Sequence, residues 1–200
     1  MDNYVQIFKR AFFDQSSRAF GETYVQNLLY KILGEQKFRG ANGIKSNLFD
    51  AQRGELRGEY KAVRVVFENE GGDNMYEKIT NFTHLSTRIG KIQDIKDGKI
   101  ISNFQNIKLH DDGGFDFDYL VYVLVDDFGF HIFEVSGDDM EKFVKDGLFQ
   151  NWCAKHGSKE TGKNGQFPVK KENIEWHFSH NHKKDVSWEE LVELAKTIKL

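Results

Sequence analysis

Residues 48–67 of this chain read LFDAQRGELRGEYKAVRVVF, and the prediction of the fold starts from this stretch. Residues 55–67 alternate in a run rich in β-branched and aromatic side chains, which predicts a strand, and Arg53-Gly54 before it predicts a tight hairpin loop. Successive side chains of a strand point to opposite faces. One face is therefore expected to carry Glu55, Arg57, Glu59, Lys61, Val63 and Val65.

Two acidic residues and a lysine are expected on that face. With a two-residue loop at Arg53-Gly54, Asp50 opposes Arg57 and lies diagonally from Glu59 at roughly 7–8 Å. Two carboxylates at that separation can share one Mg²⁺ ion, which prefers oxygen ligands together with water and substrate phosphate. Lys61 can then orient a nucleophile or stabilise a transition state. The pattern predicts metal-dependent hydrolysis of a phosphodiester.

The acid-x-lysine tripeptide is a weak signal by itself. It occurs four times, at Glu35/Lys37, Glu59/Lys61, Asp94/Lys96 and Asp97/Lys99, about as often as a composition rich in lysine and acids would give. The copy at Glu59 differs from the others because it lies in an apolar alternating strand, nine residues after an aspartate. The alternative is a ladder of solvent-facing charges, whose cross-strand pairs contribute little stability.

Length and composition restrict the class of protein. Two hundred residues suit a single domain, 1–200, with a buried core. The chain is 39% hydrophobic and 30% charged, and it shows neither an apolar run long enough to span a bilayer nor a signal peptide. We therefore expect a cytoplasmic protein. Its one cysteine, Cys153, excludes an internal disulfide and a thiolate metal cluster.

The charge is distributed unevenly along the chain. A formal net charge of −3 gives no overall basic surface, so any contact with nucleic acid must come from a local patch. Residues 148–185 hold seven lysines, four acidic residues and four histidines, and we expect this segment to be irregular and to contact DNA. The expected contacts are Lys163, Lys170 and Lys171 to phosphates and His180 and His182 to bases. A solvated surface loop is the alternative.

Helices are expected before the hairpin. Residues 3–13 and 17–33 have helical patterns, and the second begins at Ser16-Ser17 and ends at Gly34. In the second helix, Glu22 falls at the margin of the apolar stripe. It either reaches outward to solvent, the commoner arrangement, or supplies a third carboxylate near the metal. A strand over residues 43–51 is expected to lead into the hairpin.

Further elements are expected after the hairpin. Ile79, Phe82, Ile89 and Ile92 indicate a helix, and Asp97-Gly98 indicates a turn between short strands within residues 94–110. Residues 119–125 and 130–135 are predicted to be central strands, because the first is an apolar run without alternation. Capping patterns predict one helix from Ser136 to about Lys145 and a last helix from Ser187.

This order resembles that of the PD-(D/E)xK nuclease superfamily and, within it, the type II restriction endonucleases. The resemblance covers roughly residues 17–135 by element order and rests on Asp50 and Glu59-Tyr60-Lys61, with Phe49 where the motif's proline would stand. It implies an α/β fold with a mixed central β-sheet flanked by helices, built on an αβββαβ core. It also implies Mg²⁺-dependent cleavage of double-stranded DNA by Asp50, Glu59, Lys61 and Glu22, with the main-chain carbonyl of Tyr60 as a further metal ligand.

Partners are implied in the same way. Cleaving both strands of a duplex at one site calls for two active sites related by a two-fold axis, and each chain offers one. We therefore expect a homodimer bound to double-stranded DNA. A type II system would also include a cognate DNA methyltransferase.

Other functional readings compete with this one. The string His180-Asn181-His182 is similar to an HNH nuclease motif, but that class needs further His or Asn positions downstream, and the helix that follows supplies none. Cys153, His156, His180 and His182 are acceptable ligand types for Zn²⁺, although no further cysteine supports such a site. The chain is also compatible with a nicking or non-catalytic DNA-binding subunit of a heteromeric complex, because a fold does not determine a function.

Overall fold

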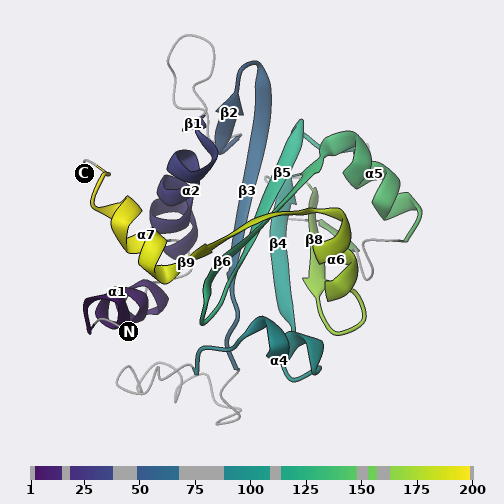
Figure 1. Cartoon of the computed structure of the whole chain (residues 1–200). Coiled ribbons are helices and arrows are strands. Elements are labelled where there is room, and N and C mark those ends of the chain that lie inside the picture. The colour runs from purple at the N-terminus through teal and green to yellow at the C-terminus, as the bar shows by residue number, and fades with distance from the viewer. Residues whose placement is uncertain are drawn as a thin grey trace.

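A six-stranded mixed β-sheet runs through the middle of the molecule (Figure 1). The computed structural model describes residues 3–14, 19–37, 49–67, 88–108, 114–147, 153–156 and 163–198. In spatial order the strands are β1 (Gln36–Lys37), β2 (Ala51–Arg53), β3 (Leu56–Arg64), β5 (Tyr119–Val125), β6 (Gly129–Ser136) and β9 (His182–Ser187). Helices flank this sheet, so the predicted α/β class with a mixed central sheet is confirmed.

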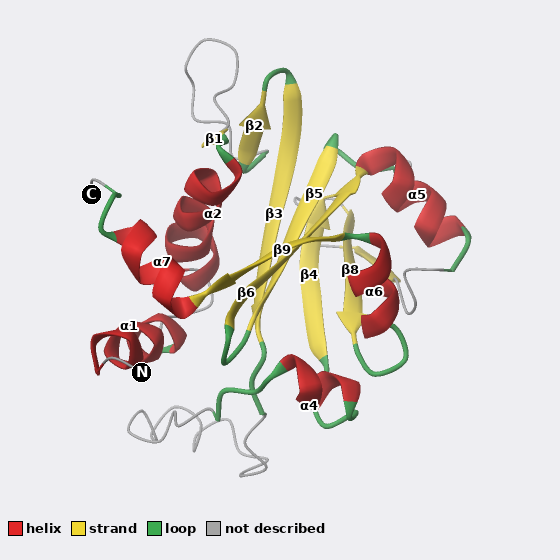
Figure 2. Ribbon diagram, in the orientation of Figure 1, coloured by secondary structure: helices red, strands yellow, loops and turns green. Residues whose placement is uncertain are grey.

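The centre of the sheet combines both strand directions (Figure 2). β2 and β3 form an antiparallel hairpin, β3 runs parallel to β5, and β5 pairs antiparallel with β6. All 7 residues of β5 are buried, because this strand is covered on both faces. A strand in that position needs apolar side chains on both faces, which explains its run without alternation. The prediction that residues 119–125 and 130–135 form central strands is confirmed.

The hairpin loop differs from the prediction by one position. Arg53 pairs with Leu56 and Gln52 pairs with Arg57, so the loop is Gly54-Glu55 rather than Arg53-Gly54. Gly54 has a φ of 60°, which suits the first loop residue of a type II′ turn. Each residue of β2 is therefore paired two places further along β3 than predicted. Because two places are one full period of a strand, the side chains keep their predicted faces.

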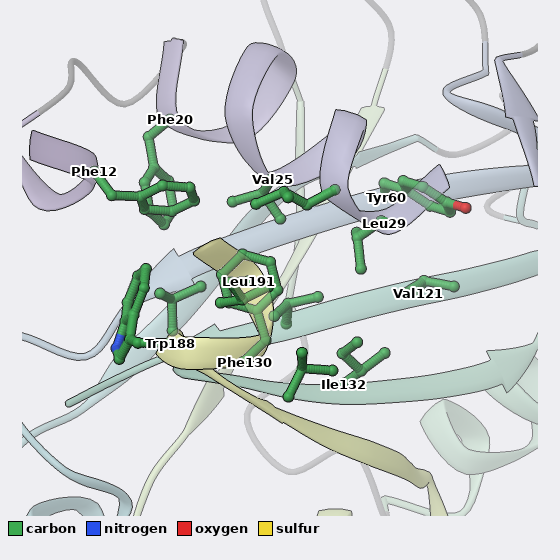
Figure 3. Close-up of a cluster of buried hydrophobic side chains, with 14 of the residues drawn as sticks. Phe12, Phe20, Val25, Leu29, Tyr60, Val121, Phe130, Ile132, Trp188 and Leu191 are labelled. Carbon is green, nitrogen blue, oxygen red and sulfur yellow. The ribbon is translucent and has the colours of Figure 1, made fainter. Parts of the chain in front are cut away.

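One face of the sheet is covered by α1 (Asn3–Phe13), η1 (Ala19–Val25), α2 (Gln26–Leu33) and α7 (Trp188–Ala195). The segment η1 is a π-helix that continues directly into α2. The buried side chains of these helices form the first core with Tyr60, Val121, Phe130 and Ile132 of the sheet (Figure 3). The predicted helix 3–13 is confirmed, as is a helical segment that ends at Gly34, whose φ is 68°. The predicted start at Ser16-Ser17 lies outside the described residues.

The opposite face is covered by a second sheet and three short helices. The sheet has the order β4 (Ser102–Lys108), β8 (Lys163–Val169) and β7 (Cys153–His156). The helices are α4 (Ile92–Lys96), α5 (Gly137–Lys145) and α6 (Ile174–His180). Phe104 and Phe167 of this sheet stack with ring centroids 5.2 Å apart and meet Tyr122 of β5 in the second core. Site residues on this face of β3 therefore lie under a covering layer.

Four expectations about elements need correction. The part of residues 148–185 that is described is not irregular, since it forms β7, β8, α6 and most of β9. Ile89 lies in a β-bridge with Val66, so the expected helix does not include Ile89, and from residue 88 onward the first helix begins at Ile92; residues 68–87, with Ile79 and Phe82, lie outside the described residues. The turn at Asp97-Gly98 joins helix α4 to strand β4 rather than two strands. Of the strand expected over residues 43–51, only Ala51 is in a strand among the described residues 49–51, and that strand, β2, runs on to Arg53; residues 43–48 lie outside the described residues.

The two predicted helix caps are confirmed. The Ser136 hydroxyl accepts a hydrogen bond from the Asp139 amide at the start of α5. At the start of α7, Ser187 and Glu190 form a capping box. Each cap satisfies main-chain amides that a helix start otherwise leaves without partners. No helix in the described part of the chain is long and apolar enough to cross a membrane.

Candidate active site

Asp50, the residue before β2, is held by three hydrogen bonds. Its carboxylate Oδ2 accepts from the main-chain amide of Tyr60 at 2.9 Å. Its own amide donates to the carbonyl of Gly58 at 3.0 Å, and its carbonyl accepts from the Tyr30 hydroxyl at 2.5 Å. The Asp50 carboxylate is thereby bonded to the main chain of Tyr60, the residue between Glu59 and Lys61.

Glu59 and Lys61 form an ion pair on β3. Lys61 Nζ lies 2.5 Å from Glu59 Oε1, and the exposed fractions of the two side chains are 20% and 0%. A buried carboxylate needs a positive partner, since removing a lone charge from water is costly. Lys61 supplies that partner while keeping limited contact with solvent.

The predicted faces of β3 agree with its packing. Tyr60 and Ala62 pack against the first core, whereas Val63 packs against the second core. Because side chains alternate along a strand, Glu59 and Lys61 share the face of Val63. The acidic residue and the lysine therefore lie together on the side of the sheet that faces β4.

The oxygen atoms of Asp50, Glu59 and Tyr60 suit a hard cation as ligands. A residue of a β-ladder that directs its N–H to a neighbouring strand presents its C=O to the same side. Since the Tyr60 amide faces Asp50, the Tyr60 carbonyl also lies on the β2 side. Two carboxylates and one carbonyl are oxygen ligands of the kind that Mg²⁺ takes. The described residues contain no cluster of three or more His, Cys, Asp or Glu side chains suited to a metal, and this set has only two such side chains.

A second charged pair lies at the entrance of β5. The guanidinium of Arg57 donates to Asp118 from Nε at 3.0 Å and from an η-nitrogen at 3.2 Å, and the Arg57 amide donates at 2.6 Å. These bonds from Arg57 lower the pKa of Asp118, so its carboxylate stays charged. Arg57 precedes Glu59 by two residues and shares its face. The face of the site therefore carries a second cation that is held in place.

Glu35 is the residue near the site that sequence reasoning missed. It follows Gly34 at the end of α2, and only 1% of its side chain is exposed. Its Oε2 accepts from the hydroxyls of Tyr60 and Tyr119, the latter at 2.6 Å, and its Oε1 accepts from Arg53 Nε at 3.0 Å. The acid-x-lysine tripeptide at Glu35/Lys37 could not be distinguished by sequence from the copies at Asp94/Lys96 and Asp97/Lys99. The one local signal was its position after the glycine that ends a helix.

Arg53 continues this network to the far strands of the sheet. Its guanidinium makes a bidentate pair with Glu134 of β6 at 2.9 and 2.8 Å, and Lys183 of β9 donates to Glu134 at 3.0 Å. Burial opposes ionisation of Glu134, but the bonds from Arg53 and Lys183 outweigh it and lower the pKa. With Glu35 included, two negative and two positive side chains alternate across the sheet. The network is therefore balanced in charge.

The tyrosines of the network are donors. Burial, and then the hydrogen bond and charge of Glu35, raise the pKa of Tyr60 and of Tyr119 far above the ordinary value. Burial and the charge of Asp50 raise the pKa of Tyr30 as well. All three hydroxyls therefore keep their protons and hold their acceptors.

Glu22 lies in η1, and its side chain is outside the described part of the structure. Its assignment as a third carboxylate stays a prediction. Tyr30, two helical turns further along, contacts Asp50.

Of the three lysines predicted to contact phosphates, Lys170 and Lys171 lie away from Asp50. Lys163 begins β8, and its side chain is outside the described part. Lys170 pairs with Glu172 at 3.3 Å, and the side chain of Lys171 lies beside Gly98 after α4. The turn that carries these two residues lies at the end of β3 opposite the hairpin (Figure 1). DNA binding by these lysines stays a prediction.

The two predicted base-reading histidines have partners within the protein. His180 stacks on Trp176 with ring centroids 4.8 Å apart, and its Nδ1 lies 3.0 Å from the Trp176 carbonyl. His182 Nε2 lies 2.8 Å from Asp185 Oδ1, which is also 2.8 Å from His131 Nδ1. The side chains of Cys153 and His156 are not described, so the zinc alternative stays untested there. Base contacts by His180 and His182 also stay predictions.

Comparison with protein-family models, with curated proteins and with solved structures found no match for this chain. A functional assignment therefore depends on the geometry around Asp50, Glu59 and Lys61.

Proposed function

We propose that this chain is a Mg²⁺-dependent endodeoxyribonuclease that hydrolyses phosphodiester bonds of double-stranded DNA, as type II restriction endonucleases of the PD-(D/E)xK superfamily do. One observation carries the proposal. The Asp50 carboxylate is bonded to the amide of the residue between Glu59 and Lys61, and the Glu59 carboxylate is buried beside the Lys61 ammonium. Two acids and a lysine are thus held together by two adjacent strands of one sheet.

The order of elements gives further support. Helix α2 is followed by β1, β2, β3, α4 and β5, and β5 lies parallel to β3 in the sheet interior. Among the described residues this order is compatible with an αβββαβ nuclease core that has β4 added between α4 and β5, which supports the proposal. The added strand pairs with β8 in the second sheet and leaves the order of the first sheet unchanged.

Each side chain of the site would have a separate role in the reaction. Asp50, Glu59 and the Tyr60 carbonyl would hold Mg²⁺, which lowers the pKa of bound water and neutralises charge on the phosphate. Lys61 lies beside Glu59 and is partly exposed, so its ammonium is available to the attacking water or to a phosphate oxygen. Arg57 adds a positive charge on the same face, held by Asp118.

The proposal extends to how DNA is bound. β3 has 9 residues, and a strand of that length spans roughly 30 Å. That is close to one turn of duplex DNA, about 34 Å. A duplex lying along this direction would reach both the hairpin and the turn with Lys170 and Lys171. Cleavage of both strands would require a homodimer. In a restriction system this homodimer would act in the cytoplasm together with a cognate DNA methyltransferase.

Plasmid cleavage tests the proposal. The purified chain is incubated with supercoiled plasmid with and without Mg²⁺, beside Glu59→Gln, Lys61→Ala and the control Asp97→Asn. Asp97 is a matched control because it also precedes a paired lysine by two residues, with Lys99 Nζ at 2.8 Å, but it is exposed. We expect cleavage by the wild type and by the control, none by Glu59→Gln, and a loss of roughly a hundredfold or more for Lys61→Ala.

The products separate the remaining alternatives. Discrete fragments would indicate sequence-specific cleavage of both strands. Nicked circles alone would indicate a subunit that needs a partner, and binding without cleavage would indicate a non-catalytic DNA-binding subunit. Equal cleavage by the wild type and Glu59→Gln would overturn the assignment of the site.

A further inference from the structure

Glu35 joins three strands of the sheet directly behind the candidate active site. Tyr60 comes from β3, Tyr119 from β5 and Arg53 from β2, and all three donate to this one carboxylate. Gly58 is adjacent, and a Cβ there would lie 2.4 Å from the Tyr119 ring. The Tyr119 ring therefore occupies the space that a side chain at position 58 would take. Gly58 precedes Glu59 on β3, and its carbonyl accepts from the Asp50 amide.

Tyr60 connects the two faces of the sheet. Its main-chain amide donates to Asp50, and its hydroxyl donates to Glu35 on the side of the first core. Figure 3 shows its ring at one end of the first core, with the hydroxyl oxygen directed away from the centre of the cluster. Glu59 and Lys61 are its immediate neighbours in the chain. A shift of Tyr60 would therefore displace Glu59 and Lys61 relative to the main chain of Asp50, which the Tyr30 hydroxyl holds separately.

We propose that Glu35 is a positioning residue that acts through the Tyr60 side chain to set the separation of the Asp50 and Glu59 carboxylates for a divalent cation; this inference rests on the proposed function. Tyr30 provides a second support, since its hydroxyl holds the Asp50 carbonyl and its ring lies 5.6 Å from that of Tyr60.

The free-energy cost of burying the charged Glu35 side chain supports the proposal. Buried ion pairs often stabilise a fold no better than well-packed apolar side chains of similar volume. The fold nevertheless buries Glu35 with a set of fixed donors behind the site. Metal ions require their ligands in a narrow range of positions, and groups behind the ligands tune affinity by orienting them. Fixing a strand residue from its far face meets that requirement.

The test compares two tyrosines that share one acceptor. Tyr60→Phe and Tyr119→Phe each remove one hydroxyl that donates to Glu35 Oε2, but only residue 60 bonds Asp50. Mn²⁺ binding to the protein alone is measured by the electron paramagnetic resonance signal of free Mn²⁺. We expect Tyr60→Phe to weaken Mn²⁺ binding about three- to tenfold, the effect of one hydrogen bond. We expect Tyr119→Phe to leave it unchanged within about twofold. Thermal melts report the stability lost by each variant.

Two further variants guard against failure of Tyr60→Phe to fold. Glu35→Gln keeps the shape of the acceptor and removes its charge, and Tyr30→Phe removes the bond to the Asp50 carbonyl. Both are expected to weaken Mn²⁺ binding and to raise the Mg²⁺ concentration needed for half-maximal cleavage. Neither is expected to change DNA affinity measured with saturating Ca²⁺. A purely structural role would lower the melting temperature without this metal-specific change.

The outcomes distinguish this inference from the proposed function. If the wild type binds Mn²⁺ and cleaves DNA but the Tyr60→Phe, Glu35→Gln and Tyr30→Phe proteins that fold bind Mn²⁺ equally well, the inference is wrong and the nuclease assignment stands. If Tyr60→Phe and Tyr119→Phe weaken binding equally, Glu35 only stabilises the sheet, and the inference is again wrong. A wild type that neither binds Mn²⁺ nor cleaves DNA overturns both.

Discussion

The carboxylate of Asp50 accepts a 2.9 Å hydrogen bond from the main-chain amide of Tyr60, on the neighbouring strand. A direct bond across the hairpin gives Asp50 a structural role in addition to the chemical role proposed for it. Substitutions at Asp50 should therefore separate the two roles, depending on whether the new side chain can still accept this bond.

Asp50→Asn and Asp50→Ala should both abolish Mg²⁺-dependent cleavage, because neither offers a carboxylate to the metal. Only Asp50→Ala leaves the Tyr60 amide without its acceptor, which should lower the free energy of unfolding by about 1–3 kcal/mol. Urea unfolding and plasmid cleavage measure the two effects. Cleavage by Asp50→Asn at the wild-type rate would remove Asp50 from the site.

Gly58→Ala should destabilise the sheet beside the site. The added Cβ would lie 2.4 Å from the Tyr119 ring, and overpacking of this kind costs about 1–3 kcal/mol. Gly21→Ala is the control, since a Cβ at that helical position meets nothing within 4 Å. Thermal unfolding of the two variants compares them. Equal stability of Gly58→Ala and Gly21→Ala would contradict the close approach of Tyr119.

The stability of the fold should depend on pH through His131. Burial alone would lower the pKa of His131, but Asp126 and Asp185, which flank its two ring nitrogens at 3.1 and 2.8 Å, raise it above the ordinary value. His182 also lies at Asp185 Oδ1. A histidine with a raised folded pKa contributes stability below about pH 6.5, its unfolded value, and that stability is lost as pH rises through the folded pKa.

His131→Gln tests this dependence. The difference in free energy of unfolding between the wild type and the variant should be largest below about pH 6 and should shrink as the pH rises. Urea unfolding at a series of pH values measures it. A difference that grows with pH would mean that His131 is neutral in the folded protein.

If the segment around Lys171 binds DNA, the salt dependence of the DNA affinity should show it. Lysines that contact phosphates release counterions, so Lys171→Ala should flatten the slope of log affinity against log salt by about one unit. Lys170→Ala should flatten it less, because Lys170 is already paired with Glu172. The control is Lys145→Ala on α5, and Ca²⁺ replaces Mg²⁺ to prevent cleavage. Unchanged slopes in both variants would mean that DNA binds elsewhere.

Local patterns were sufficient to predict much of the fold. The caps at Ser136 and Ser187, the end of a helix at Gly34 and the apolar run of β5 each depend on neighbours within a few residues. The faces of β3 were also predicted correctly, because alternation does not depend on the position of the turn. The loop itself was misplaced by one residue, since Gly54 can occupy either loop position and the sequence does not distinguish them.

Contacts between distant residues could not be predicted. Glu35 binds partners 18, 25 and 84 residues away, so its role requires the assembled sheet. β8 pairs with β4 across a long separation, and its sequence KNGQFPV contains glycine and proline, which weaken any strand pattern. This is why residues 148–185 were expected to be irregular.

The most direct test of the central claim is to locate the metal. Crystals of the wild-type protein grown with Mn²⁺ would be measured for anomalous scattering, beside crystals of Glu59→Gln. We expect an anomalous peak coordinated by the Asp50 and Glu59 carboxylates and the Tyr60 carbonyl, which is lost or weakened in Glu59→Gln. Mn²⁺ bound only elsewhere, with Glu59 still paired to Lys61, would contradict it.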